Sequence, residues 1–335
     1  VGSEMCIRDR VNGSDSIFIE RNGHMEKWDK KFESVERLSD VAQRIAAMSN
    51  RMVNEASPVA DTRLSDGSRV SIVLPPVAIN GPVITIRKFY DTPLTIERLI
   101  ELESITAEAA EFLSRLVKSR YNIFISGGTG SGKTTFLNVL SDYIPEDERI
   151  VTIEDSAELQ LHNVSNLVRL EARMANLEGC NAVGIRDLIK ASLRMRPDRI
   201  VVGEVRGAEA IDMLQAMNTG HDGSLSTGHA NSPKDMMTRL ETMVLMGMEM
   251  PVTAIRSQIS SAIDIVVHLA RLRDKSRKVV QIAEVGDYIG GEVALTPLYK
   301  FVETGQDKNG KVFGKLVRQE NSLIRTEKLK AAGYM

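Results

Sequence analysis

One octapeptide restricts the possible folds of this chain more than any other feature. Residues 127–134 read GGTGSGKT, a complete match to the phosphate-binding pattern G-x-x-x-x-G-K-[ST]. The loop follows residues 121–126, an apolar run typical of a buried parallel strand, and it opens a segment whose apolar residues have helical spacing. A strand, this loop and a helix in succession are the context that the motif requires. The sequence therefore predicts an α/β core with a P-loop.

Each part of the loop has a physical role in binding a nucleotide. Glycines let backbone N–H groups approach phosphate oxygens without a clash, and the helix N-terminus adds partial positive charge. Lys133 is expected to reach the β- and γ-phosphates of ATP, and the Thr134 hydroxyl to hold Mg²⁺. A purely structural glycine turn would not need this Lys-Thr pair. The predicted nucleotide-binding residues of this segment are Gly127, Gly128, Thr129, Gly130, Ser131, Gly132, Lys133, Thr134 and Thr135.

Two predicted strands end in acidic residues, at the position where open α/β sheets bind their ligands. The run RIVVGE places Glu204 at one strand end, and RIVTIED places Glu154 and Asp155 at another. Hydrolysis needs groups that complete the metal shell and orient the attacking water. Glu204 is expected to contact the Mg²⁺ and its water shell or to act on the attacking water, and Glu154 competes for the role of general base. For both, a solvated strand-end carboxylate is the structural alternative.

A glycine- and serine-rich segment, residues 219–233, carries two histidines. His229 is predicted to sense the γ-phosphate or to link it to a neighbouring subunit, and it joins Lys133 among the catalytic candidates. A metal site is not expected here, because no third ligand stands at suitable spacing. For His221 a structural and a functional role are equally compatible with the sequence.

Residues 11–92 have the pattern of a small α+β domain. Two hairpin signals, Asn22-Gly23 and Asp66-Gly67, stand between short runs of strand character. Apolar residues at steps of three and four predict an amphipathic helix over 34–52. The predicted strands are residues 16–20, 23–28 and 83–89.

The texture changes after a predicted linker, residues 93–104, and residues 105–335 are predicted to form a larger domain. A helix around 96–117 leads into alternating strands and helices, the pattern of a mostly parallel α/β sheet. Beyond Pro251 the chain ends in strands around 264–304 and a basic terminal helix. The further strands predicted for the parallel part of the sheet are residues 149–155, 166–172, 199–205 and 224–230.

The composition, with 26% charged and 42% hydrophobic residues, is that of a soluble globular protein, and 335 residues suffice for two domains. The formal net charge of -2 lacks the basic excess of a nucleic-acid binder. No apolar run of about 18 residues predicts a transmembrane segment. Two cysteines, Cys6 and Cys180, are too few for a four-thiolate zinc site, and a reducing compartment is expected. Residues 1–10 are predicted to be a foreign stub on a truncated chain.

Several segments together resemble the secretion-superfamily ATPases that power type II secretion, type IV pili and type IV secretion. Gly207 follows Arg206 where the type II and pilus-retraction branches usually have aspartate, and the most similar branch is the tight-adherence (Tad/Flp) pilus ATPase of the CpaF type. The resemblance covers nearly everything from Val11 onward. It is carried by LRMRPDRIVVGEVRG (193–207, similar to a Walker B segment), IEDSAEL (153–159, an Asp box), STGHANSP (226–233, a His box), DTRLSDGSRV (61–70) and LPPVAINGPVITIRKF (74–89).

The resemblance implies a RecA-like P-loop domain preceded by the α+β domain, a homohexamer, and ATP with Mg²⁺ in the cleft between the domains. It implies phosphate contacts for Arg63, Arg69 and Arg87, with Arg206 and Arg194 beside the Walker B strand. Arginine suits this role because its planar fork pairs bidentately with phosphate oxygens, although ordinary surface salt bridges are the alternative. Zinc is not expected, since the tetracysteine segment of some relatives is missing. The implied setting is the cytoplasm, at inner-membrane platform proteins.

Four classes of function remain to be compared. A pilus-assembly or secretion motor, with the type IV secretion traffic ATPase as its variant, accounts for all the motifs. A nucleic-acid motor on the same core would need a basic channel, which neither the charge balance nor the aromatic content of 4% favours. A small-molecule kinase would not explain the two-domain layout, and a nucleotide-sensing scaffold would differ from a motor only in turnover.

Overall fold

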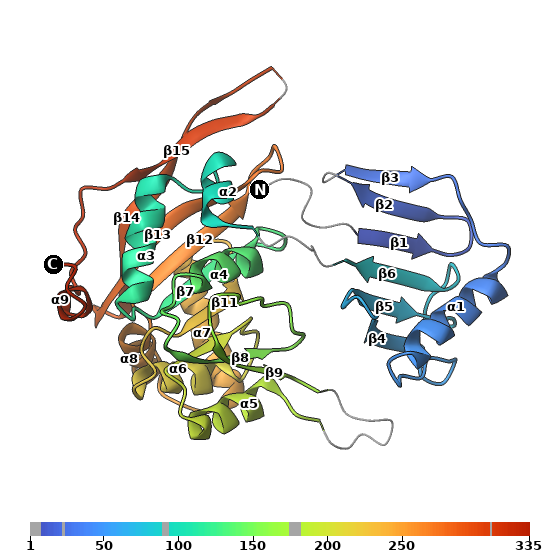
Figure 1. The fold of residues 1–335 in the computed structure, drawn as a ribbon, viewed down its shortest axis with the longest axis horizontal. Coiled ribbons are helices and arrows are strands. Elements are labelled where there is room, and N and C mark those ends of the chain that lie inside the picture. The colour runs from blue at the N-terminus through green and yellow to red at the C-terminus, as the bar shows by residue number, and fades with distance from the viewer. Residues whose placement is uncertain (1–7, 22–23, 89–93, 174–181, 309) are drawn as a thin grey trace. The chain divides into compact units, whose positions relative to one another are not determined.

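The computed structural model describes residues 8–21, 24–88, 94–173, 182–308 and 310–335 (Figure 1). The chain divides into two compact units, Val1–Pro93 and Leu94–Met335. Each unit has its own sheet, so the predicted α+β unit followed by an α/β unit is confirmed. Within the described residues, the structure contains no helix that is both long and apolar enough to span a bilayer.

In its described residues, the first unit is a six-stranded antiparallel sheet in the order β3-β2-β1-β6-β5-β4 together with helix α1. Both predicted hairpin pairings are confirmed, with Ile17 opposite Trp28 and Arg63 opposite Arg69, while the Asn22-Gly23 turn lies outside the described residues. Residues 8–10, predicted to belong to a stub, continue strand β1 between β2 and β6. The elements are β1 (Arg8–Asn12), β2 (Ile17–Arg21), β3 (His24–Trp28), α1 (Val35–Ala47), β4 (Val59–Arg63), β5 (Arg69–Val73) and β6 (Val83–Arg87).

Helix α1 packs the apolar stripe that the sequence predicts. The Ser34 hydroxyl accepts a hydrogen bond from the Arg37 amide at 3.1 Å, which caps the first turn. Leu38 and Ala42 are fully buried in the core of this unit. The helix ends at Ala47 and not at residue 52 as predicted, because the chain turns into the left-handed conformation at Asn50, with φ of 53°.

The second unit is built on a nine-stranded mixed sheet in the order β15-β14-β13-β12-β7-β11-β10-β8-β9. The strands from β9 to β12 in this order run parallel, and β13 to β15 extend the sheet antiparallel. Helices α5 to α8 pack together on one face, and α3 and α4 contact each other on the other (Figure 1). The strands are β7 (Ile123–Gly127), β8 (Arg149–Glu154), β9 (Asn166–Glu171), β10 (Arg199–Val202), β11 (Leu225–His229), β12 (Ile265–Arg271), β13 (Arg277–Ile289), β14 (Glu292–Gln306) and β15 (Val312–Arg318).

One prediction for the start of this unit is wrong: residues 96–117 are two helices. The first helix ends before Glu103, which has a left-handed φ of 54°, and the Ser104 amide donates a hydrogen bond back to the Leu99 carbonyl. Thr106 then caps the next helix by accepting from the Ala109 amide. The predicted linker, 93–104, therefore contains a helix of its own. The helices of the unit are α2 (Ile96–Glu101), α3 (Ala107–Lys118), α4 (Lys133–Ser141), α5 (Ile185–Ser192), the short 3₁₀ turn η2 (Leu193–Met195), α6 (Ala210–Asn218), α7 (Pro233–Gly247), α8 (Val252–Ala262) and α9 (Glu327–Ala331).

The strand order gathers the predicted site at one edge of the sheet. Strand β11 lies between β7, which leads into the P-loop, and β10, which leads to Glu204. Strand β8, ending in Glu154, flanks β10 on its other side. Because these strands are parallel, their carboxyl ends meet at a common edge, the place where such sheets bind ligands.

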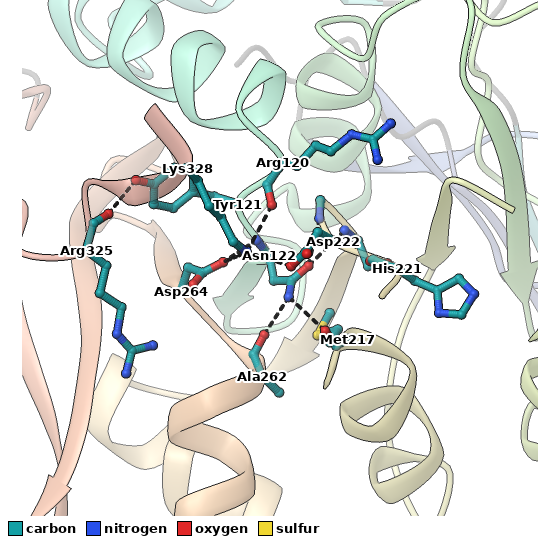
Figure 2. A network of polar contacts seen from close by, with 12 residues as sticks. Arg120, Tyr121, Asn122, Met217, His221, Asp222, Ala262, Asp264, Arg325 and Lys328 are labelled. Atoms are coloured by element: carbon teal, nitrogen blue, oxygen red, sulfur yellow. Dashed lines mark hydrogen bonds and ion pairs between the residues drawn. The ribbon is translucent and has the colours of Figure 1, made fainter. Parts of the chain in front are cut away.

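A lysine near the C-terminus joins the opposite edge of the same strands (Figure 2). The Lys328 ammonium lies 2.7 Å from Asp222 and 2.8 Å from Asp264, and it donates to the Arg120 carbonyl at 3.1 Å. Asp264 also accepts from the Asn122 amide at 2.8 Å, and its side chain is only 9% exposed. Helix α9 is thus fastened to the starts of β7, β11 and β12.

We expect Lys328→Met to lower the free energy of unfolding by about 1–3 kcal/mol, because it leaves a nearly buried carboxylate without its cation. Chemical denaturation of the whole chain measures this loss. The matched control is Lys330→Met, an exposed lysine on the same helix, which we expect to change little. Equal stability of the two variants would show that the contacts of Lys328 with Asp222 and Asp264 do not stabilise the fold.

Candidate functional site

The P-loop has the open geometry that anion binding needs. Gly130 and Gly132 have φ of 71° and 95°, left-handed values that glycine adopts readily. A Cβ at Gly127 would lie 2.4 Å from the Leu269 carbonyl oxygen, so only glycine fits there. A Cβ at Gly128 or Gly130 would meet nothing within 4 Å. Gly132 caps α4 without a side-chain hydrogen bond, which leaves the first amides of the helix available to a ligand.

Lys133 lies at the centre of this loop. It is 7% exposed, and its Nζ donates to the carbonyls of Gly127 at 3.2 Å and Gly128 at 3.1 Å. The same Nζ lies 3.3 Å from Nδ1 of His229. Burial lowers the pKa of Lys133 to about 8, against the opposing effect of the Glu204 carboxylate. A cation desolvated to this degree gains from a bound anion, which favours its full charge.

Glu204 is held between two nitrogen-bearing side chains. Its Oε1 lies 2.7 Å from Nε2 of His229, and its Oε2 accepts from Arg206 at 2.6 Å (Nη2) and 2.9 Å (Nε). Arg206 also lies 3.6 Å from Asp155. Burial lowers the pKa of His229, with the nearby Lys133 charge acting in the same direction, so His229 is mostly neutral at pH 7. Lys133, His229, Glu204 and Arg206, all predicted from the sequence, therefore form one contiguous cluster.

Glu154 occupies a drier position at the end of β8. It is 3% exposed, its Oε2 accepts from the amides of Glu158 at 2.6 Å and Leu159 at 2.9 Å, and its Oε1 is buried without a hydrogen-bond partner. Burial raises the pKa of Glu154 to about 7, although the two amides act against it. Gly203 leaves room for this side chain, since a Cβ there would lie 2.9 Å from Cγ of Glu154. The sequence alone did not reveal this reason for the glycine.

The three arginines predicted in the first unit form one row across its sheet. Arg63 of β4 stands opposite Arg69 of β5, and Arg69 stands opposite Arg87 of β6. Residues directly opposite in antiparallel strands have side chains on the same face. All three side chains are half-buried and take part in polar interactions. The predicted turn at Asp66-Gly67 places Arg63 near Arg69, but the sequence did not indicate that Arg87, eighteen residues after Arg69, joins them.

The remaining candidates lie at two places: some at the carboxyl ends of the parallel strands of the larger sheet, beside the P-loop, and others at the amino ends of these strands. Thr134 and Thr135 lie half-buried in the first turn of α4, and Thr129 is exposed in the loop. His221 lies before β11, at the end of the strand opposite the P-loop, where Nδ1 of its ring lies 3.2 Å from the Ala216 carbonyl oxygen, so the geometry supports a structural role. Arg194, in η2 before β10, also lies at the amino ends of the strands.

Sequence reasoning missed two buried groups beside the loop. His268 of β12 lies 2.8 Å from the Ser126 hydroxyl, one residue before the P-loop. Arg277, the first residue of β13, donates to the Gly130 carbonyl. Both come from the C-terminal strands, and only the pairing of β12 with β7 brings them to this site. The sequence pattern does not show which distant strands pair, so it could not indicate that these two residues lie beside the loop.

The chain is similar to proteins of secretion and conjugal transfer systems. A profile of the family described as type II/IV secretion system protein matches residues 5–314. A Mycobacterium tuberculosis protein, described provisionally as a conjugal transfer protein, is 36% identical over 292 residues, which are 85% of this chain and 82% of that protein. The type IV secretion system protein PtlH of Bordetella pertussis is 32% identical over 306 residues, covering 84% of this chain and 89% of PtlH.

The fold is also found in solved structures. The X-ray structure of the Legionella pneumophila ATPase DotB has a TM-score of 0.57 to this chain at 20% identity, over 86% of this chain and 78% of DotB. At this identity the likeness supports the fold alone, and the α/β unit with its P-loop is RecA-like.

Proposed function

This chain belongs to the type II/IV secretion system protein family, and from that premise we propose that it hydrolyses ATP to drive a membrane-bound pilus-assembly or secretion machine. The observation that carries the proposal is the convergence of Lys133, Glu204, His229 and Arg206 at a P-loop with an uncapped helix N-terminus. A lysine, a carboxylate and an arginine around a phosphate cradle are groups that enzymes use for phosphoryl transfer to water. A scaffold that only binds nucleotide would not need the buried Glu154 beside them.

The loop is proposed to cradle the phosphates of ATP. Gly127 to Thr135 would supply backbone amides, and Lys133 would exchange its bonds to loop carbonyls for the β- and γ-phosphates. Nδ1 of His229 lies 3.3 Å from Nζ of Lys133, and its Nε2 lies 2.7 Å from Oε1 of Glu204. We propose that His229 couples the binding of the γ-phosphate at Lys133 to the position of the Glu204 carboxylate. Arg206 would add a positive charge at the same end of the sheet.

The residues present fit a Mg²⁺ ion that arrives with ATP. A hard divalent cation takes oxygen ligands, and the Thr134 hydroxyl at the start of α4 with the Glu204 carboxylate would supply them. When bound, the ion neutralises negative charge on the β- and γ-phosphates. The Glu204 side chain is only 19% exposed, and its Oε2 lies 2.6 Å from Nη2 of Arg206, which holds the carboxylate at the end of the strand.

Glu154 is the better candidate for the general base. Its pKa near 7 puts it where a base is most effective at neutral pH, and one of its oxygens has no protein partner. Oε1 of Glu204 also lacks a hydrogen-bond partner, but the surroundings of Glu204 differ, because its oxygens lie 2.7 Å from the His229 ring and 2.6 Å from cationic Arg206. We therefore assign Glu154 to the attacking water and Glu204 to the metal.

The arginine row is proposed to bind phosphate as well. Arg63, Arg69 and Arg87 occupy three successive strands in register, so their side chains share one face of the sheet. Guanidinium groups pair bidentately with phosphate oxygens, so a row of three suits the binding of phosphate. We propose that the row binds phosphate oxygens of a nucleotide.

The finer assignment concerns the machine. The Walker B segment and residues 61–89 support a CpaF-type ATPase of a Tad/Flp pilus, working as a cytoplasmic homohexamer on inner-membrane platform proteins. A type IV secretion traffic ATPase is the second candidate, favoured by relatives such as PtlH. Zinc and nucleic acid have no place in either proposal. Complementation separates the two candidates: the chain with its own operon restores either surface pili or substrate export in a deletion strain.

We expect the purified chain to hydrolyse ATP with a requirement for Mg²⁺ and without stimulation by DNA, and to form hexamers when nucleotide is present. Phosphate release and native mass spectrometry measure the two properties. Strong stimulation by single-stranded DNA would favour the nucleic-acid motor. A monomer that binds ATP without turnover would favour the scaffold, and the absence of any nucleotide binding would overturn the proposal.

A further inference from the structure

We propose that Arg277 is a positioning residue for the P-loop, holding the peptide that follows Gly130 so that the loop amides face the phosphates. This inference rests on the proposed function, because it concerns how the nucleotide is bound. The Arg277 side chain is 9% exposed, and its Nε donates to the Gly130 carbonyl at 2.9 Å. Its Cδ would lie 3.6 Å from a Cβ at Gly132, so the arginine stem packs beneath the turn of the loop.

The sheet register explains how a residue so distant in the chain reaches the loop. Strand β12 pairs with β7 so that Leu269 stands beside Gly127, and β13 returns along β12 with Arg277 opposite Arg271. The turn of this hairpin therefore lies next to the point where the chain leaves β7. Arg277 begins the returning strand and extends its side chain across to the loop.

A glycine-rich loop needs such a fixed point. Gly127, Gly128, Gly130 and Gly132 leave the loop many accessible backbone conformations, and binding a nucleotide must select one. Lys133 already bonds the carbonyls of Gly127 and Gly128, and Arg277 bonds the carbonyl of Gly130. In a trans peptide the N–H points away from the carbonyl, so fixing a carbonyl also fixes the direction of the next amide.

The element that carries Arg277 is itself anchored. The next residue, Lys278, is 3% exposed and donates to the Glu103 carbonyl at 3.1 Å. The Val279 amide donates to the Ser104 carbonyl at 2.8 Å. The start of β13 is thus held by the corner between α2 and α3 on one side while Arg277 holds the loop on the other. A guanidinium presented from a rigid strand end positions its partner better than one on a mobile loop.

The test compares Arg277→Met with Arg271→Met, its exposed neighbour directly across the hairpin. We expect Arg277→Met to weaken the binding of Mg-ADP by about tenfold, as the loss of a hydrogen bond from a charged donor implies. We also expect faster hydrogen exchange in residues 127–134 with little change in melting temperature. Arg271→Met should leave both unchanged, and Arg277→Lys, which keeps a charged donor, should restore part of the affinity. Calorimetric titration and exchange mass spectrometry measure these effects.

The outcomes separate this inference from the proposed function. If the unaltered chain does not bind Mg-ADP, the proposed function fails. If it binds but Arg277→Met binds equally well, the function stands and the positioning role is overturned. Weaker binding with unchanged exchange in 127–134 would also overturn it, because the arginine would then act through its charge alone. If Arg277→Met does not fold, Arg277→Gln, which keeps a neutral donor, serves for the same comparison.

Discussion

Replacement of Lys133 with alanine is expected to abolish ATP turnover while the chain stays folded. The ammonium is the cationic group at the centre of the loop, and removing a charged donor aimed at the reacting phosphate lowers kcat by more than about 100-fold. Stability should not fall with it, because the folded chain desolvates this ammonium and lowers its pKa to about 8. Phosphate release measures turnover, and thermal melting by circular dichroism measures the fold.

The matched control for this substitution is Lys118→Ala, an exposed lysine in the last turn of α3. It changes the net charge equally, so a general electrostatic effect would appear in both variants. Turnover in Lys133→Ala equal to that of the control would show that the loop does not bind the reacting phosphates, and the proposed ATPase site would be wrong. Loss of turnover together with unfolding would instead assign Lys133 a structural role.

The fold could be predicted well where local pattern decides it. The P-loop motif predicted both β7 and α4, because a strand and a helix must flank it. The strands predicted at 149–155 and 199–205 correspond to the buried strands β8 and β10, which end at Glu154 and Val202. Both hairpins of the first unit followed from their turn dipeptides. In each case neighbouring residues carry the information.

Prediction failed where a single backbone conformation or a distant contact decides the structure. The break between α2 and α3 depends on one left-handed residue, Glu103, inside a segment whose apolar spacing reads as continuous helix. The arginine row depends on the register of three strands. Arg277 and Gly130 are 147 residues apart, and their hydrogen bond exists only because β12 pairs with β7. A linear pattern contains none of this information.

For the two glutamates of the site, the sequence indicated their position, whereas their different surroundings are seen only in the structure. Their position at strand ends marked both as candidates, and the sequence left open which one is the base. Their surroundings differ: Glu154 is desolvated and bonded by two amides, whereas Glu204 lies between a guanidinium and an imidazole. Burial and neighbouring charge set a carboxyl pKa, and both are properties of the folded chain.

Replacement of Glu154 with glutamine is therefore expected to lower kcat by about 10²–10⁴-fold while Mg-ATP still binds. Glutamine keeps an acceptor for the amides of Glu158 and Leu159 but cannot take a proton from water. The base must be ionised to act. With the pKa of Glu154 raised to about 7, kcat of the unaltered chain should fall about tenfold for each pH unit below 7 and level off above it. The residual rate of Glu154→Gln should lack this dependence on pH.

Two further variants decide the assignment. Glu171→Gln is the matched control, an exposed carboxylate beside Glu154 in the register of β8 and β9, and it should leave kcat unchanged. Glu204→Gln should raise the Mg²⁺ concentration needed for half-maximal turnover, because a neutral amide oxygen binds a hard cation more weakly than a carboxylate. If Glu204→Gln instead removes the pH dependence and Glu154→Gln keeps it, the two roles are exchanged. The desolvation of Glu154 would then serve the packing at Gly203 and not the activation of water.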